Sequence, residues 1–335
     1  MTDYVELHAH SAFSFLDGAS LPEELVGAAV DLGYEAMALT DHDGLYGSME
    51  FSRAARAAGL TPITGAEISL NDGTHITLLA ETTEGYGNLC RLISAAHGGP
   101  GAMVGPADDM DPDAEPPDRI APRLEPSLLA DHASGLILLT GCRQGPLSRA
   151  IDAEQPSEAV RRLREFHEWF GEGNVYIELQ HNLVFGDTHR TRELARLAAR
   201  EGVPTVATGN VHYHHRDRHR LQDVLVAIRH RTTLDGAHRH RRPNSEWVLR
   251  EPQQMAARFR DYPEAIRATK EIAERCGAFD LTRDLAYVFP NYPTDPGDTP
   301  DELLGRICHE AIARRYAPSE HAVATERLHE ELRLI

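Results

Sequence analysis

Histidines follow two short apolar segments near the start of this chain. His8 and His10 close the segment 5–9, and His42 closes the segment 36–40. Side chains two residues apart on a strand project to the same side, so the first two imidazoles would face one point. Imidazole is a common metal ligand, and a second strand end adds a ligand from a new direction, as a site for several metals requires. The pattern predicts a metallohydrolase.

Two later strand ends carry further candidate ligands. Glu67 stands near the end of the apolar segment 62–69, where a buried carboxylate needs a partner that a metal can supply. His212 comes shortly after the segment 205–208. Taken singly, a histidine or glutamate at such a position is more often a loop residue than a metal ligand. Their recurrence at strand ends is hard to explain by chance and indicates one shared site.

The elements that must position these side chains alternate between short apolar strands and amphipathic helices. The expected strands are residues 5–9, 36–40, 62–69, 75–80, 136–140, 175–180 and 205–208. The expected helices between them are residues 21–32, 48–58, 86–96, 127–132, 157–170 and 188–201. Such alternation is typical of parallel βα units. The number of units favours a closed or nearly closed α/β barrel, whose sites lie at the C-terminal ends of the strands.

After residue 212 the expected elements are helices with few strands between them. Helices are expected over 217–229, 252–259, 262–275, 300–316 and 319–334, with a Pro- and Asp-rich linker near 284–300. We therefore expect a barrel domain with its helices over 1–284, followed by a linker and helices over 285–335 that are cut short inside the last helix. A loop dense in Gly, Pro and Asp over about 99–124 predicts an exposed, disordered insertion.

The bulk composition is ordinary for a soluble globular protein. Of the 335 residues, 41% are hydrophobic and 26% charged. No apolar run is long enough to cross a membrane, and the N-terminus lacks a basic region with an apolar core. The four cysteines are widely spaced and form no disulfide framework, which fits a reducing compartment. These features predict a cytoplasmic protein with no membrane partner.

The net charge is −18 and is unevenly distributed. An acidic chain binds DNA poorly without specific contacts, because phosphate contacts dominate that affinity. The stretch 107–118 is acidic and Pro-rich, whereas 214–242 is rich in Arg and His. Nucleic acid would bind at the second stretch, although a solvated helix face explains its composition equally well.

Four motifs in order resemble the PHP (polymerase and histidinol phosphatase) domain family. They are His8-Ala-His10-Ser11 with Asp17-Gly18, Thr40-Asp41-His42, Gly65-x-Glu67, and Asn210-x-His212-Tyr213. The later segments Arg242-Pro243-Asn244-Ser245-Glu246, Ala273-Glu274-Arg275-Cys276 and Phe289-Pro290 look like the alpha subunit of bacterial DNA polymerase III. The form Gly209-Asn210-Val211-His212 is similar to the error-prone, damage-tolerant branch of that family.

This resemblance implies a distorted (β/α)7 barrel that holds up to three metal ions, Zn²⁺ or Mn²⁺, and is followed by helices leading into a polymerase body. The implied ligands are His8, His10, Asp17, His42, Glu67, His97, Cys142, Asn210 and His212. For His97 the alternative is a helix C-terminal residue favoured by the helix dipole. For Cys142 it is a small buried residue, although a thiolate suits zinc.

The chemistry implied by the resemblance is phosphoester hydrolysis by water activated between metals, used as 3′–5′ trimming of DNA. Asp17 and Asp41 are candidate contributors to this catalysis. The parent enzyme would be an error-prone DNA polymerase that uses Mg²⁺ and contacts DNA and other replication or translesion proteins. No Pro-Asp-x-Asp-x-Asp stretch is present, so this sequence alone is not expected to polymerise DNA.

Asn210 departs from the phosphoesterases of the family, which have Asp there. The amide keeps the shape but loses the charge, so metal affinity should fall. Two alternatives therefore stay open: a free-standing PHP phosphoesterase acting on a small ester such as histidinol phosphate, and a metal-stabilised structural domain without catalysis. Of three further polar residues, His75 is expected to be a packed strand residue, whereas Gln180 and His181 could line the pocket.

Overall fold

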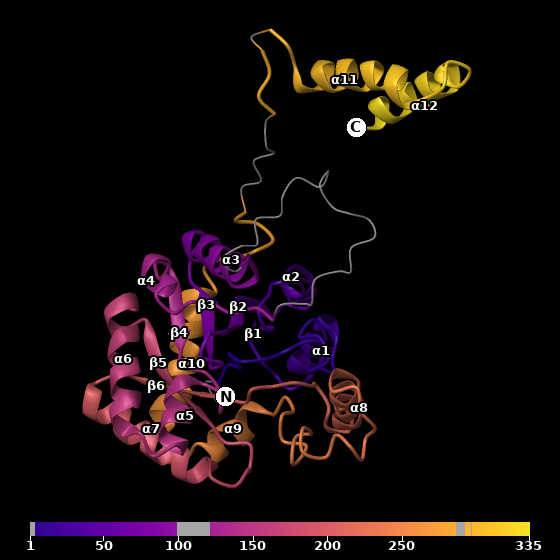
Figure 1. Cartoon of the computed structure of the whole chain (residues 1–335). Helices are drawn as coiled ribbons and strands as arrows, with labels where there is room; N and C mark the ends of the chain where they lie inside the picture. The colour runs from indigo at the N-terminus through magenta and orange to yellow at the C-terminus, as the bar shows by residue number, and fades with distance from the viewer. Residues whose placement is uncertain (1–3, 99–120, 286–291, 296) are drawn as a thin grey trace. The chain divides into compact units, whose positions relative to one another are not determined.

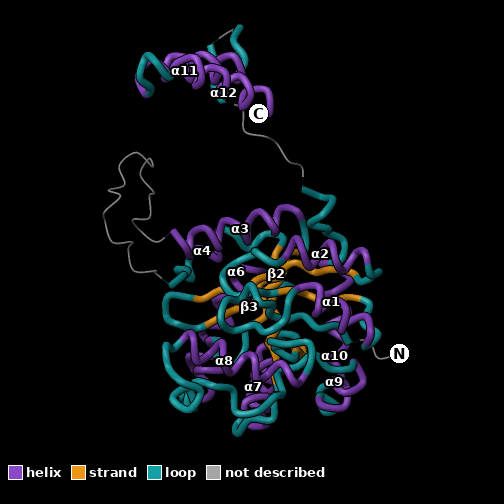
Figure 2. The backbone as a smooth tube through the Cα atoms, turned by 90° about the vertical axis from the view of Figure 1, so that its right-hand side faces the viewer, coloured by secondary structure: helices purple, strands orange, loops and turns teal. Residues whose placement is uncertain are grey.

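The computed structural model describes residues 4–98, 121–285, 292–295 and 297–335. They belong to two compact units, Met1–Leu285 and Ala286–Ile335. In the first unit six strands form one curled sheet in chain order, with helices around it (Figure 1; Figure 2). The strands are β1 (Ala36–Leu39), β2 (Thr61–Ser69), β3 (His75–Ala80), β4 (Leu136–Leu139), β5 (Val175–Gln180) and β6 (Thr205–Thr208). The expected α/β class with a barrel-like sheet is confirmed.

One strand runs against the others. The pairs β1–β2, β4–β5 and β5–β6 are parallel, but β3 is antiparallel to both β2 and β4. The expectation of parallel units throughout is therefore wrong at β3. The physical reason is the short connection 70–74, because a parallel crossover needs a dozen or more residues. The first residue of β3 consequently lies at the same sheet edge as the last residues of β2.

The expected strand 5–9 is present as isolated bridges rather than as a regular strand. Glu6 bridges to Met37 of β1, and Ala9 bridges to Val211, which follows β6. The backbone N–H of His10 donates to the carbonyl of Val211 at 2.7 Å, and that of Ala38 donates to the carbonyl of Glu6 at 2.8 Å. The N-terminal segment thus lies between the two edges of the sheet and occupies the place of a seventh strand in the barrel.

The helices of the first unit follow the expected alternation. They are α1 (Pro22–Asp31), α2 (Ser48–Ala57), α3 (Thr83–Gly98), α4 (Leu128–Asp131), α5 (Pro146–Asp152), α6 (Pro156–Phe170), α7 (Asp187–Glu201), η2 (Arg216–Arg218), α8 (His219–Arg229), α9 (Pro252–Arg258) and α10 (Pro263–Cys276). Several begin with proline, whose fixed φ and missing N–H suit the first turn of a helix. Helix α5 was not expected from the sequence.

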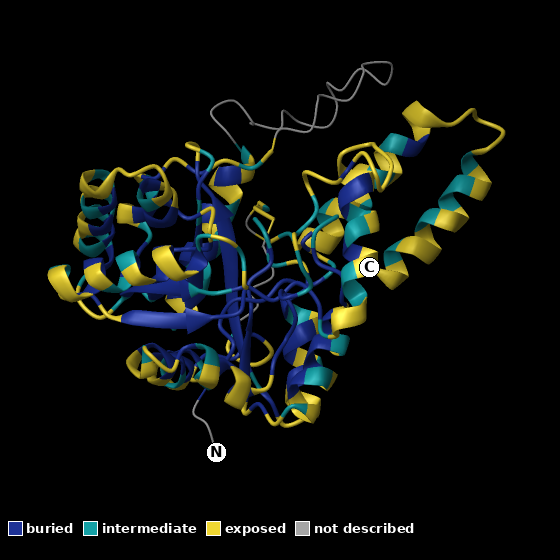
Figure 3. Ribbon diagram, turned by 90° about the horizontal axis from the view of Figure 1, so that it is seen from below, coloured by how far each residue is buried: buried dark blue, intermediate teal, exposed yellow. Residues whose placement is uncertain are grey.

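The two faces of the sheet bury different sets of side chains. Met37 and Leu39 face the surrounding helices, whereas the alternate residues Ala36 and Ala38 face the barrel interior. Ile272 of α10 belongs to the interior cluster, so this helix covers one end of the barrel. Figure 3 shows the buried strands at the centre and the exposed outer faces of the helices. The interior at the opposite end is polar and contains the candidate site.

The second unit contains α11 (Pro300–Arg315) and α12 (His321–Leu334), and Thr299 caps α11 by accepting a hydrogen bond from the N–H of Glu302. Its assignment to the start of a polymerase body stays a prediction. Most of the expected insertion 99–124 lies outside the described residues, but Leu124 is buried and bridges to Leu70. Within the described residues, no helix is long and apolar enough to cross a bilayer.

Candidate metal centre

The polar end of the barrel interior follows from strand alternation. On β2, Ile63 faces the interior cluster, and Glu67, four residues on, faces the same side. On β5 the inward residue Tyr176 is followed two residues later by Glu178. Both carboxylates are almost fully buried, at 1% exposure. Buried charge is costly without a partner, so each carboxylate must be matched by donors or cations at this end.

One oxygen of Glu67 faces three histidines. Its Oε2 lies 3.2 Å from Nε2 of His10, 3.4 Å from Nε2 of His8 and 3.2 Å from Nδ1 of His42. Burial alone would raise the pKa of Glu67, but His42 and His8 outweigh it and hold the pKa well below its usual range. The carboxylate is therefore an anion, which is the form that binds a metal.

The other oxygen of Glu67 faces two further donors. Its Oε1 lies 3.2 Å from Nδ1 of His75 and 3.3 Å from Sγ of Cys142, a buried residue after β4. His75 was expected to be a packed strand residue, and sequence reasoning missed its position beside the cluster. The missed signal was the short 70–74 connection, which reverses β3 and brings its first residue to the site.

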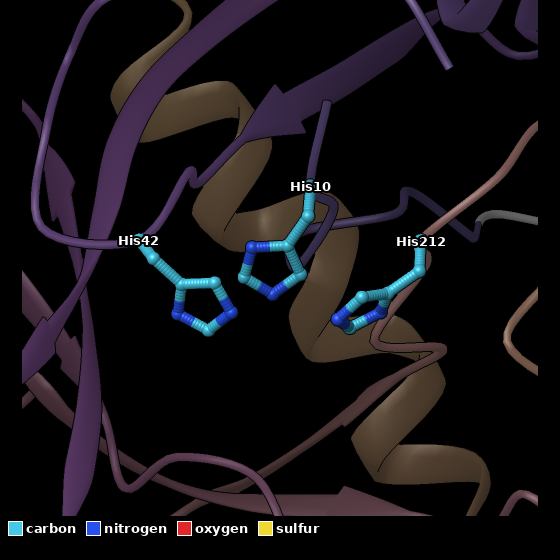
Figure 4. Close-up of side chains that lie close together, drawn as sticks. All are labelled: His10, His42 and His212. Atoms are coloured by element: carbon cyan, nitrogen blue, oxygen red, sulfur yellow. The ribbon is translucent and has the colours of Figure 1, made fainter. Parts of the chain in front are cut away.

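Three histidine rings from separate segments meet next to Glu67. The ring centroids of His10 and His42 are 4.3 Å apart, and those of His10 and His212 are 4.4 Å apart. Figure 4 shows His10 between the other two rings. Asp17 lies beside them, with Oδ2 3.1 Å from Nε2 of His42 and 3.4 Å from Nε2 of His212. Four predicted site residues from three different segments thus come together.

The donor atoms form overlapping sets that could each hold an ion. In each set, one ligand atom per residue lies within 4.8 Å of the others. The sets are His10–His42–His212, His8–His10–Glu67, and His42–Glu67–His75. Because His10, His42 and Glu67 are each shared by two sets, neighbouring ions could be bridged by common ligands.

The surroundings of the His212 ring indicate whether the cluster can hold a cation. Its Nδ1 lies 2.9 Å from the carbonyl oxygen of Asn210 and donates to it, which leaves Nε2 with a lone pair. That Nε2 is buried and has no hydrogen-bond partner among the described residues. Burial, with a contribution from Arg242, lowers the pKa of His212 to about 4, so the ring is neutral at neutral pH. A buried, unprotonated and unpartnered nitrogen fits a metal ion.

Asn210 adds a second unpartnered acceptor. Its Oδ1 is buried without a hydrogen-bond partner among the described residues. The backbone adopts φ +49°, a left-handed conformation that Asn tolerates better than most residues. This turn lets the carbonyl of Asn210 orient His212 while its amide oxygen stays free. The amide can bind a metal, but it brings no negative charge.

His8 is oriented by a carboxylate that sequence reasoning missed. Its Nδ1 lies 2.7 Å from Oε1 of Glu178, while its Nε2 lies 3.1 Å from Nε2 of His10. Although burial lowers the pKa of His8, Glu178 and Glu67 outweigh it and raise the pKa to about 10. A metal would take the place of the proton on Nε2. The sequence signal that could have revealed this partner of His8 is Glu178 itself, a lone acid inside the apolar run Val175–Gln180.

Asp17 also carries an ion pair at the edge of the cluster. Its Oδ1 lies 3.0 Å from a terminal nitrogen of Arg242, whose guanidinium lies 5.0 Å from the ring centroid of Trp247. Burial would raise the pKa of Asp17, but the Arg242 guanidinium outweighs it and holds the pKa well below its usual range. The aspartate is thus an anion placed between the histidines and a fixed arginine.

Asp41 and His97 make hydrogen bonds away from the donor cluster. Asp41 accepts hydrogen bonds of 2.7 Å from the N–H and hydroxyl of Ser11 and from the hydroxyl of Ser14, so it holds the turn after His10. The Nε2 of His97, at the exposed end of α3, lies 2.7 Å from the carbonyl oxygen of Asp43. His97 as a ligand and Asp41 as a contributor to catalysis stay predictions.

The two residues expected at the pocket wall differ in position. Gln180 lines a small cavity beside the cluster and donates to Oε1 of Glu178 at 2.7 Å. His181 instead places Nε2 3.1 Å from the hydroxyl of Thr188. The cluster itself opens into a pocket of about 340 Å³, lined by Asp17, His42, Glu67, His75, Cys142, Gln144, Arg149, Asn210, His212, Val226, Arg229, His230, His240 and Arg242. The same pocket is thus lined both by the donor side chains and by several cationic side chains.

The family follows from comparison with known proteins. Residues 6–182 match the model of the PHP domain, and the chain belongs to this family. It is 39% identical over 339 residues to an error-prone DNA polymerase of Symbiobacterium thermophilum. This match covers 99% of this chain and 30% of the relative. It is 38% identical over 344 residues to an error-prone DNA polymerase of Mycobacterium tuberculosis, with the same two coverages. The chain thus spans about 30% of the length of these relatives.

One solved structure matches part of the chain. An amidohydrolase from Chromobacterium violaceum matches with a TM-score of 0.44 and 18% identity, over 62% of this chain and 87% of the other.

Proposed function

We propose that this chain is the N-terminal PHP part of an error-prone DNA polymerase of replication and translesion repair. Its support is the identity of 38–39% to relatives of that name over 99% of the chain. DNA synthesis with Mg²⁺, and contacts with other replication proteins, would belong to the rest of such an enzyme. The free-standing phosphoesterase finds less support, because these relatives are about three times as long as the chain.

Within that protein, the cluster would bind up to three Zn²⁺ or Mn²⁺ ions and hydrolyse phosphodiesters, trimming DNA from the 3′ end. One observation carries this proposal: both oxygens of the buried Glu67 carboxylate face donors that fall into overlapping sets. The residues that would hold the ions are His8, His10, Asp17, His42, Glu67, His75, Cys142, Asn210 and His212. Bound ions would supply Lewis-acid activation of water and neutralise phosphate charge.

The protein's own contribution is orientation and charge. Glu178 fixes the ring of His8, and the carbonyl of Asn210 fixes that of His212, so that both Nε2 atoms point into the cluster. Arg242 stands at the pocket wall on the ring of Trp247, where its planar guanidinium could bind a phosphate oxygen. Because its rotation is restricted by this stacking, it would lose little freedom on binding substrate.

A second candidate function is a metal-stabilised domain without catalysis. The observation that favours it is Asn210, whose unpartnered amide oxygen occupies a position where an anionic ligand would contribute charge. Fewer anionic ligands weaken metal binding and alter the charge around the reacting phosphate. Segments distant in sequence would still be tied together by the ions, which would stabilise the fold.

Substitution of Asn210 by Asp separates the two functions. The experiment measures Mn²⁺-dependent release of nucleotides from the 3′ end of a labelled oligonucleotide by the wild type and by Asn210→Asp. We expect slow release by the wild type and at least about tenfold faster release by the variant, because the aspartate restores an anionic ligand. Metal binding by both proteins without release by either would leave the structural function and contradict the catalytic one.

A further inference from the structure

One wall of the pocket is cationic. Arg229 and His230 at the end of α8, and His240 and Arg242 after it, line the pocket that contains the metal-donor cluster. Arg149 lines it from α5. In a chain of net charge −18, this concentration of arginine and histidine at the opening of the pocket is a local reversal of charge.

Three arginines of this wall and its flanks have no ion-pair partner in the part of the chain that the structure describes. The neighbouring Arg241 pairs with Asp223 at 3.1 Å. By contrast, no carboxylate among the described residues lies within 4.0 Å of Arg229, Arg231 or Arg239, and all three are exposed. Unpaired guanidinium groups next to a pocket are available to an external anion, and arginine suits phosphate in particular.

Two exposed aromatic rings stand among these arginines. The imidazoles of His230 and His240 are stacked, with centroids 3.8 Å apart and planes 14° apart. Both residues are exposed and line the pocket. Aromatic faces beside arginines are the combination that binds the bases and phosphates of single-stranded nucleic acid.

We propose that the basic rim, defined as Arg229, His230, Arg231, Arg239, His240 and Arg242, binds single-stranded nucleic acid and guides its end into the pocket. Arg229, Arg231 and Arg239 would contact successive phosphates, and the histidine pair would stack with a base. A single strand fits better than a duplex, because enzymes reach one nucleotide in a pocket only when it is unpaired. The purpose of this contact rests on the proposed hydrolytic function, but the binding does not.

A protein partner is the competing occupant. Leu221, Val224 and Ile228 are exposed on α8 at helical spacing, as in a helix that packs against another protein. However, these apolar residues do not line the pocket, whereas Arg229 and His230 do. The position of the cations at the opening therefore favours a strand that enters it.

The test is fluorescence anisotropy of a labelled oligothymidylate with the whole chain, in EDTA and across a series of NaCl concentrations. The rim variant carries Arg229→Gln, Arg231→Gln and Arg239→Gln. The matched control carries Arg53→Gln, Arg192→Gln and Arg267→Gln, which are exposed arginines of α2, α7 and α10 without an ion pair among the described residues. Both variants lose the same charge.

We expect the rim variant to bind more weakly and to lower the slope of log K against log salt by about 2, since each phosphate contact contributes about 0.7. The control should keep the wild-type slope. Equal weakening in both variants, or none in the rim variant, would overturn the proposal. So would equally tight binding of a duplex, or competition by polyglutamate as strong as that by unlabelled oligothymidylate, which would assign the rim to an acidic protein.

Failure of this binding proposal and failure of the proposed hydrolytic function can be distinguished by separate experiments. The binding experiment contains no metal and no hydrolysis, so its result stands even if the cluster is inert. An assay of the wild type with Mn²⁺ and a small phosphodiester tests hydrolysis without the rim.

Discussion

The two ends of the barrel interior are formed by the same strands but contain opposite chemistry. On β2 the inward side chains change from Ile63 to Glu67, and on β3 they change from Leu79 to His75. At the first end, α10 packs Ile272 into the interior and excludes water. At the second end, His8, His10 and His212 are buried together with the carboxylates of Glu67 and Glu178, whereas His42 and His75 are partly exposed.

This difference shows what each end requires for stability. The apolar end is stabilised by removal of its side chains from water, which needs no specific partner. The polar end buries charges that must be neutralised by one another or by an ion. We therefore expect changes at the apolar end to alter the free energy of unfolding, and changes at the polar end to alter metal binding.

The largest effect is expected from Glu67→Ala. Because both carboxylate oxygens face donors of the cluster, its removal should weaken Mn²⁺ or Zn²⁺ binding by more than about 100-fold. Calorimetric titration measures this. The matched control is Glu81→Ala, which removes a carboxylate after β3 that pairs with Arg275 of α10, and which should leave metal affinity unchanged. Equal affinity of wild type and Glu67→Ala would refute the assignment of Glu67.

The next effect is expected at the opposite end, from Ile272→Ala. Ile272 is fully buried in the interior cluster. Its truncation should lower the free energy of unfolding by about 3 kcal/mol through lost transfer energy and a cavity. Urea unfolding measures the stability, and titration of the folded variant should give wild-type metal affinity. A parallel loss of metal affinity would mean that the two ends are not independent.

A smaller effect is expected from Glu178→Gln. The substitution keeps the size of the side chain but removes the anion that holds Nδ1 of His8, so metal affinity should fall by about 10- to 100-fold. Glu81→Gln is the control at the apolar end. If both variants bound metal as the wild type does, orientation of His8 by Glu178 would be unimportant.

The smallest effect concerns a charge cluster outside the barrel. Burial alone would raise the pKa of Glu246, but hydrogen bonds from Arg216 and Arg258 outweigh it and lower the pKa to about 2. A carboxyl whose pKa is lowered on folding stabilises the fold above its unfolded pKa and loses this contribution as pH falls. The loss should therefore occur between about pH 4.5 and pH 2.

Glu246→Gln should remove that part of the acid-unfolding curve and cost about 1 kcal/mol at neutral pH, because Arg216 is half exposed and its pairing is screened. Urea unfolding across this pH range measures it. An unchanged pH dependence in the variant would contradict the ion-pair explanation, and the metal site should be unaffected in either case.

Much of the site could be predicted because strand alternation and parallel order constrain it. His8, His10, His42 and Glu67 were identified at strand ends, and the structure brings their side chains together. His75 was not recognised, because periodicity does not reveal that β3 is reversed. Whether these side chains are ligands is still a prediction.

Other parts could not be predicted from local patterns. Glu178 lies in an apolar run, and only the tertiary structure shows that His8 lies beside it. The N-terminal segment reads as a strand, but it forms isolated bridges between β1 and the chain after β6. His97 was proposed through the resemblance alone; its Nε2 lies 2.7 Å from the carbonyl oxygen of Asp43, and its role as a ligand stays a prediction.

The most direct test of the central claim is the number of metal ions bound per chain after equilibrium dialysis against Mn²⁺ or Zn²⁺, measured by mass spectrometry of the elements. The account predicts more than one ion per chain in the wild type and a loss of ions in His10→Ala, because His10 belongs to two donor sets. Absence of bound metal in the wild type, or an unchanged number in His10→Ala, would contradict it.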